Sequence, residues 1–85
     1  LLRVSALCQA RCLELSTHTA PAVHAHAGVA LAPVVHLEYF HDHVRIERML
    51  FDGAPEPEGG LLAPDTSRPG LGLDLRRSDV ERYAA

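Results

Sequence analysis

Apolar and polar residues follow one another along the chain in short blocks that predict helices alternating with strands. Residues 2–12 carry apolar side chains at helical spacing, which predicts a helix with one buried face. Residues 13–17, LELST, predict a short strand, and Pro21 suits the first turn of a helix that runs to Pro33. Residues 34–40, VVHLEYF, are rich in β-branched and aromatic side chains and predict a second strand.

The order strand, helix, strand predicts a βαβ unit, in which the two strands are parallel. Residues 42–50, DHVRIERML, predict a short helix with Asp42 as its N-cap. The expected fold class is therefore α/β. Two parallel strands do not stand alone, because both faces and both edges of the pair need cover, so we expect them to belong to a larger sheet.

The last third of the chain predicts a different kind of structure. Residues 49–65, MLFDGAPEPEGGLLAPD, place two apolar stretches around a turn rich in Pro, Glu and Gly, which predicts a hairpin. A loop and a short strand are expected in residues 67–75. Residues 78–84 predict a terminal helix, in which Ser78 and Glu81 have the spacing of a capping box.

Composition narrows the class of protein. The chain has 85 residues, enough for one small domain at most, and a formal net charge of -3, which argues against a nucleic-acid binder. No apolar run is long enough to cross a bilayer. Cys8 and Cys12 lie four apart on a predicted helix, where a disulfide fits poorly, so we expect reduced thiols in the cytoplasm. The first residues have the pattern of a helix interior without an N-cap, so we expect a piece of a longer protein.

All the histidines lie in one half of the chain, and metal binding is one interpretation of them. They are His18, His24, His26, His36, His41 and His43. The pair His24 and His26 falls on a predicted helix, where positions two apart point roughly 200° from each other and do not chelate one ion. The pair His41 and His43 lies at a strand–helix junction and is less constrained. No cysteine is close enough in sequence to complete a zinc pattern.

Position in the predicted fold gives a second interpretation, which concerns His18 and Glu38. Both fall at the carboxyl ends of the predicted parallel strands, where the catalytic groups of α/β barrels lie. A neutral imidazole takes up a proton near pH 7, and a buried carboxyl tends toward protonation and can donate to a developing oxyanion. The alternatives are a loop histidine bonded to backbone and an ion pair of Glu38 with Arg45. Glu47 and Arg48 are expected on a solvated face.

Four segments, in this order, carry a resemblance to a known family. They are Ser16-Thr17-His18, His36-Leu37-Glu38-Tyr39, Phe51-Asp52-Gly53 and Pro69-Gly70-Leu71-Gly72. The set resembles the C-terminal end of the enolase superfamily, on its mandelate racemase and muconate lactonizing enzyme side. The resemblance implies that residues 1–50 are the last part of a (β/α)₇β TIM-like barrel. It also implies that residues 51–85 are a C-terminal tail that packs on an α+β capping domain.

The resemblance also implies an activity. His18 is expected to act as the general base that moves the proton α to a carboxylate, and Glu38 to hydrogen-bond that carboxylate as it becomes an enediolate. A Mg²⁺ cofactor is implied, with its ligands on strands that precede Leu1. Dehydration of a sugar acid is the first expectation and racemisation or epimerisation of a 2-hydroxy acid the second. The partners expected are a small carboxylate substrate and, at full length, further copies of the same protein, but neither nucleic acid nor membrane.

Two classes without this catalysis stay open. One is a non-catalytic or truncated interaction module, and the other is a small histidine-rich metal-binding protein. For the 85 residues taken alone we expect no activity, and we also expect exposed apolar strand edges that lower solubility.

Overall fold

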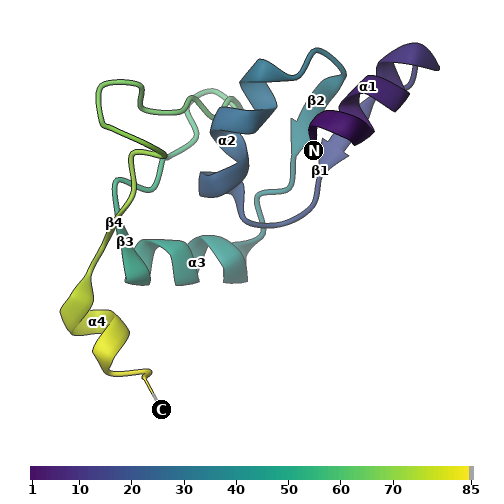
Figure 1. Cartoon of the computed structure of the whole chain (residues 1–85). Helices are drawn as coiled ribbons and strands as arrows, with labels where there is room; N and C mark the ends of the chain where they lie inside the picture. Colours follow the sequence, from purple (N-terminus) through teal and green to yellow (C-terminus); the bar gives the residue numbers. More distant parts are fainter. Residues whose placement is uncertain (85) are drawn as a thin grey trace.

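Two parallel strands and the helix between them form the centre of the molecule (Figure 1). The computed structural model describes residues 1–84. Strand β1 (Leu15–Thr17) pairs in parallel with β2 (Val34–Leu37), and helix α2 (Pro21–Ala30) connects them. The predicted βαβ unit is therefore confirmed, although both strands are shorter than the apolar blocks that predict them. Helix α2 ends at Ala30, three residues before Pro33.

Helices α1 (Leu2–Ala10) and α3 (His41–Leu50) flank this unit, and α3 packs against α2. The buried face expected on α1 is wrong for this chain, because Leu2 and Leu7 are exposed and the buried residue of the helix is Ser5. None of the residues in 1–84 covers the apolar side of α1.

The predicted N-caps are also wrong. Helix α3 begins at His41, so Asp42 lies inside its first turn, where its charge still complements the helix dipole. Helix α4 (Arg77–Glu81) begins one residue before Ser78, and no side chain caps it. Ser78 therefore lies within the helix and makes no capping box with Glu81.

The C-terminal tail forms a second small sheet in place of the predicted hairpin. Strand β3 (Phe51–Asp52) is antiparallel to β4 (Asp74–Leu75), and the long loop between them contains only an isolated bridge from Glu58 to Leu61. Pro64 in the expected second strand lacks the N–H that a ladder needs, and the first apolar stretch pairs with a more distant partner.

The core is small for a chain of this length. The buried apolar side chains are Pro21, Ala22, Ala25, Leu31 and Val44. The radius of gyration is 14.3 Å, whereas a compact domain of this size has about 12 Å. Large apolar side chains on α1 and α2 are exposed, as Leu2, Leu7 and Val29 illustrate. The elements therefore offer apolar surface that the described residues do not bury.

Candidate functional site

His18 and Glu38 meet at the carboxyl ends of β1 and β2. The register of the two strands places Thr17 opposite Leu37, so the next residue of each chain segment leaves the sheet on the same side. The Nδ1 atom of His18 lies 2.7 Å from Oε2 of Glu38. The sequence predicted both residues at this rim, and the structure brings them into direct contact on adjacent strands. Glu38 is not paired with Arg45 in residues 1–84.

Glu38 accepts a second hydrogen bond, from the backbone N–H of Thr19 at 2.9 Å. This bond, more than the hydrogen bond and charge of His18, lowers the pKa of the Glu38 carboxyl, and burial opposes the shift only in part. The side chain is 36% exposed. The expectation of a buried carboxyl that tends toward protonation is therefore wrong for this chain. Glu38 is an ionised acceptor here.

The contact decides which nitrogen of His18 carries the proton. An ionised carboxylate only accepts hydrogen bonds, so Nδ1 must be the donor of the pair. In the neutral ring, Nε2 then keeps its lone pair. The His18 side chain is 82% exposed, which leaves that nitrogen open to a ligand. In this arrangement Nε2 of the imidazole can act as a base, and the carboxylate on Nδ1 stabilises the imidazolium that forms when Nε2 takes a proton.

The turn that joins β1 to α2 has an uncommon backbone. Thr19 and Ala20 have φ angles of 56° and 42°, in the left-handed region, where a non-glycine residue costs roughly 1–2 kcal/mol. The Nδ1 atom of His24 lies 2.8 Å from the carbonyl oxygen of Thr19. The turn is therefore held at both polar backbone groups of Thr19, by Glu38 at the N–H and by His24 at the carbonyl.

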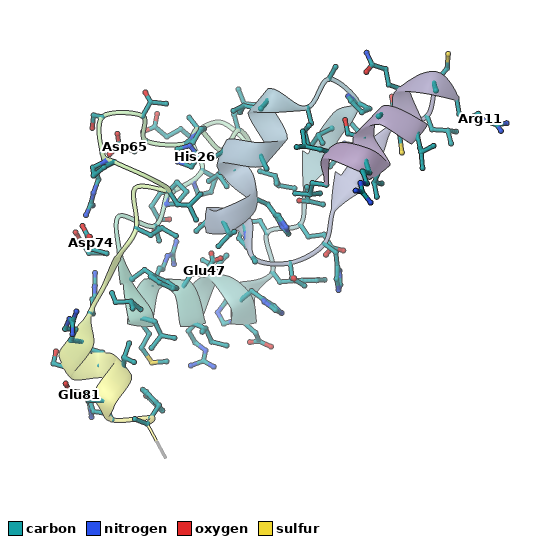
Figure 2. The ribbon with its side chains drawn as sticks, in the orientation of Figure 1. Arg11, His26, Glu47, Asp65, Asp74 and Glu81 are labelled. Carbon is teal, nitrogen blue, oxygen red and sulfur yellow. The ribbon has the colours of Figure 1, made fainter. Side chains whose placement is uncertain are left out.

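Glu47 of α3 caps the start of α2. Both of its carboxylate oxygens lie 3.2 Å from the backbone nitrogen of Ala22, which donates to them. Figure 2 shows the Glu47 side chain on the side of α3 that looks toward α2. Burial raises the pKa of Glu47, while the bond from Ala22 works against the rise. The carboxylate supplies the acceptor that the α2 N-terminus lacks, since Ala20 has no capping side chain.

These roles of Glu47 and His24 were not predicted from the sequence. Glu47 was expected to be solvated, yet it is buried beside Val44, which precedes it by three residues. That spacing on a helix was the available signal, because positions three apart share a face. For His24 no sequence signal existed, because its bond depends on the conformation of the preceding turn.

The remaining histidines do not form a metal site. Within residues 1–84 no group of three or more His, Cys, Asp or Glu side chains could hold an ion. His41 contacts only the neighbouring Asp42, at 3.4 Å, and the ring of His43 lies 6.0 Å from that of Phe40. The thiols of Cys8 and Cys12 are free. No helix in the described part of the chain is long and apolar enough to span a membrane.

Comparison with known proteins gives two findings. The sequence profile of the family described as "Enolase C-terminal domain-like" matches residues 1–80. Among solved structures, the chain is similar to a mandelate racemase/muconate lactonizing enzyme-like protein from Rubrobacter xylanophilus, with 57% sequence identity and a TM-score of 0.93. The match covers 99% of this chain and 23% of that one, so this chain spans less than a quarter of that protein's length. No curated protein matches the chain.

Proposed function

The chain belongs to the enolase C-terminal domain-like family, of the mandelate racemase/muconate lactonizing enzyme type, and from this premise we propose that the full-length protein removes the proton α to a carboxylate, with His18 as general base. The observation that carries the proposal is the 2.7 Å contact between His18 Nδ1 and Glu38 Oε2. It leaves the exposed Nε2 as the basic atom of the ring.

In the proposed reaction His18 acts first as a general base and then as a general acid. Nε2 of His18 takes the α-proton, and Nδ1–H of the imidazolium that forms stays hydrogen-bonded to Oε2 of Glu38. Nε2 then returns the proton to the carbon or delivers it to a leaving hydroxyl. A return to the carbon gives racemisation or epimerisation, and delivery to the leaving group gives dehydration.

Glu38 has a second proposed role, toward the substrate carboxylate. Donation to an enediolate oxygen requires the protonated acid, whereas the pKa of Glu38 is lowered by Thr19 and His18. A substrate carboxylate placed beside Glu38 acts in the opposite direction, because a like charge disfavours the ionised form. We propose that substrate binding draws a proton onto the other oxygen of Glu38, Oε1, which then donates a hydrogen bond to the enediolate while Oε2 still accepts from His18 and Thr19.

The Mg²⁺ implied by the family does not fit the residues described here, because residues 1–84 contain no set of side chains that could hold it. Its ligands would have to come from other segments of the full-length protein. No step is therefore assigned to the metal.

The barrel architecture, the outcome of the reaction and the assembly of the full-length protein are also proposals. A (β/α)₇β barrel is supported by the parallel βαβ unit with polar groups at its carboxyl edge. Both outcomes begin with the same proton removal. Dehydration of a sugar acid is proposed ahead of racemisation because dehydration is common in the family this chain resembles. The full-length protein is proposed to be a cytoplasmic homo-oligomer.

Replacement of His18 by Asn in the full-length protein tests the proposal. A general base contributes about 10²–10⁴-fold, so exchange of the α-proton with D₂O should fall by at least that lower factor. Binding of the acid should be nearly unchanged. The measurement is ¹H NMR of a panel of sugar acids in D₂O, with calorimetry for binding.

Two further variants complete this test. Glu38→Gln should slow turnover by up to about 10²–10³-fold, the cost of a lost oxyanion donor elsewhere, because the Gln amide donates to the enediolate more weakly than a carboxylic acid does. His36→Asn is the matched control, because His36 is an exposed histidine on β2 outside the contacting pair, and it should keep the wild-type rate. Undiminished exchange in His18→Asn would refute the base assignment, and a rate within about twofold of wild type in Glu38→Gln would leave that residue a structural role only.

A further inference from the structure

The turn at Thr19 and Ala20 connects the proposed base to the helix that follows it. Both residues have positive φ angles without being glycine. A backbone of this kind persists where neighbouring groups hold it in place, and such turns concentrate at functional sites. The groups that hold this one are therefore candidates for an indirect part in the chemistry.

Hydrogen bonds from three side chains hold the turn and the first residues of α2 that follow it. Glu38, after β2, accepts from the Thr19 N–H at 2.9 Å. Glu47 of α3 accepts from the Ala22 N–H at 3.2 Å. His24 of α2 lies with Nδ1 2.8 Å from the Thr19 carbonyl oxygen. A carbonyl oxygen accepts and never donates, so Nδ1 of His24 carries a proton whichever charge state the ring has.

Thr19 takes part in two of these bonds, through its N–H and through its carbonyl. Its N–H fixes the same Glu38 oxygen, Oε2, that contacts His18. Its carbonyl is the acceptor for His24. The N–H and the carbonyl of Thr19 belong to the two peptide groups on either side of its Cα, so the two bonds together fix the φ and ψ angles of Thr19.

We propose that His24 is a positioning residue for the pair His18 and Glu38. Its Nδ1–H holds the Thr19 carbonyl, which keeps the turn left-handed and the Thr19 N–H on Glu38. Glu38 in turn keeps its oxygen on Nδ1 of His18. The base assignment of His18 comes from the proposed function, on which this inference rests, whereas the effect of His24 on Glu38 does not depend on catalysis.

The test compares His24→Leu with His24→Asn in the full-length protein. Leu removes the donor, whereas the amide nitrogen of Asn takes nearly the place of Nδ1 and donates to the same carbonyl. The readout is the titration of the Glu38 carboxyl, followed by ¹³C NMR. Charged groups that bear on this titration are His18 and His43, so both are kept in every variant.

In His24→Leu the Thr19 N–H should leave Glu38, and the Glu38 carboxyl should titrate nearer the ordinary glutamate range. The rate of α-proton exchange should fall about tenfold to a hundredfold with KM little changed, as expected for a misplaced base. His24→Asn should restore both properties. His26→Leu, two residues along the same helix and not bonded to the turn, should change neither.

An unchanged Glu38 titration in folded His24→Leu overturns the proposal, and so does a folded His24→Asn that fails to restore it. If His24→Leu does not fold, His24→Gln replaces it. The amide nitrogen of Gln lies one bond further from the backbone than that of Asn, so it should hold the Thr19 carbonyl less well. The Glu38 carboxyl of His24→Gln should therefore titrate nearer the ordinary glutamate range than that of His24→Asn. Equal Glu38 titrations in the two variants would count against the proposal. Failure of the proposed function looks different, because exchange would then survive in His18→Asn while the Glu38 titration still responds to His24.

Discussion

The strand–helix unit, residues 15–50, and the tail, residues 51–84, hold their shapes by different kinds of interaction. In the unit, backbone pairing of β1 with β2 and a few buried side chains fix the geometry. In the tail, Arg68 bridges the carboxylates of Asp52 on β3 and Asp74 on β4, and both of these acidic side chains are largely exposed. Buried contacts are insensitive to salt, whereas exposed ion pairs are screened by it.

The difference explains where a precise site can be built. The unit places His18 and the Thr19 N–H within hydrogen-bonding distance of Glu38 because strand register and a buried helix cap set their backbones. The tail has little buried side-chain surface, and its pairing depends on a glycine and on surface charge. The tail is therefore expected to open more readily than the unit, and three substitutions measure how far the two regions differ.

The largest effect on stability is expected at Gly53 in the tail. Gly53 has a φ angle of 86°, and a Cβ there would overlap the carbonyl oxygen of Gly72. Gly53→Ala should lower the free energy of opening of β3 and β4 by about 2–4 kcal/mol, from left-handed strain together with overpacking. Native-state hydrogen exchange of the β3 and β4 amides measures it.

Gly59→Ala is the matched control for this prediction. Gly59 also has a positive φ angle, of 57°, but nothing lies near the added Cβ. Only the backbone strain of roughly 1–2 kcal/mol should appear. If Gly53→Ala and Gly59→Ala lowered the free energy of opening equally, the close approach of Gly72 to position 53 would contribute nothing to stability.

The next effect is expected at Glu47 in the unit. Glu47→Ala leaves the Ala22 N–H without its acceptor, which should cost about 1–2 kcal/mol as for other lost N-caps. Glu47→Gln keeps an acceptor oxygen and should cost less. Hydrogen exchange at α2 and β1 reports the loss, and protection of the tail should not change. A loss of protection that is equal in both regions would contradict the separation of unit and tail.

The two glutamates of the unit should give opposite pH dependence. Burial raises the pKa of folded Glu47, so stability falls as pH rises through that value, because the folded state must then release a proton that it holds more tightly than the unfolded chain. The pKa of folded Glu38 is lowered, so its contribution is present above the ordinary glutamate pKa and is lost as pH falls below it. Glu47→Gln should abolish only the first slope.

The smallest effect is expected at Arg68. Arg68→Met keeps much of the aliphatic stem and removes the charge that joins Asp52 to Asp74. Exposed ion pairs contribute about 0.2–1 kcal/mol each, so the loss at β3 and β4 should be small and should shrink further at high salt. Exchange rates of the tail amides at low and at high ionic strength test this, and a salt-independent loss would point to packing of the stem.

Much of the site was visible in the sequence. Parallel strands flanking one helix, with His18 and Glu38 just after them, predict that both residues lie at the same edge of the sheet. The protonation state of Glu38 was not visible, because it depends on the Thr19 N–H. The pairing of β3 with β4 was missed for a similar reason, since a nearer apolar stretch competed with the true partner some twenty residues away.

What the sequence determined by itself is the order of elements, the parallel pairing and the two residue types at the strand ends, because local periodicity and connection length carry that information. What the tertiary structure decided is which atoms meet. The His18–Glu38 contact, the bond from His24 to Thr19 and the Glu47 cap each depend on a backbone conformation or a helix packing that no single segment encodes. The donor–acceptor distance of a hydrogen bond varies by only a few tenths of an ångström, and only the packed chain fixes atomic positions that closely.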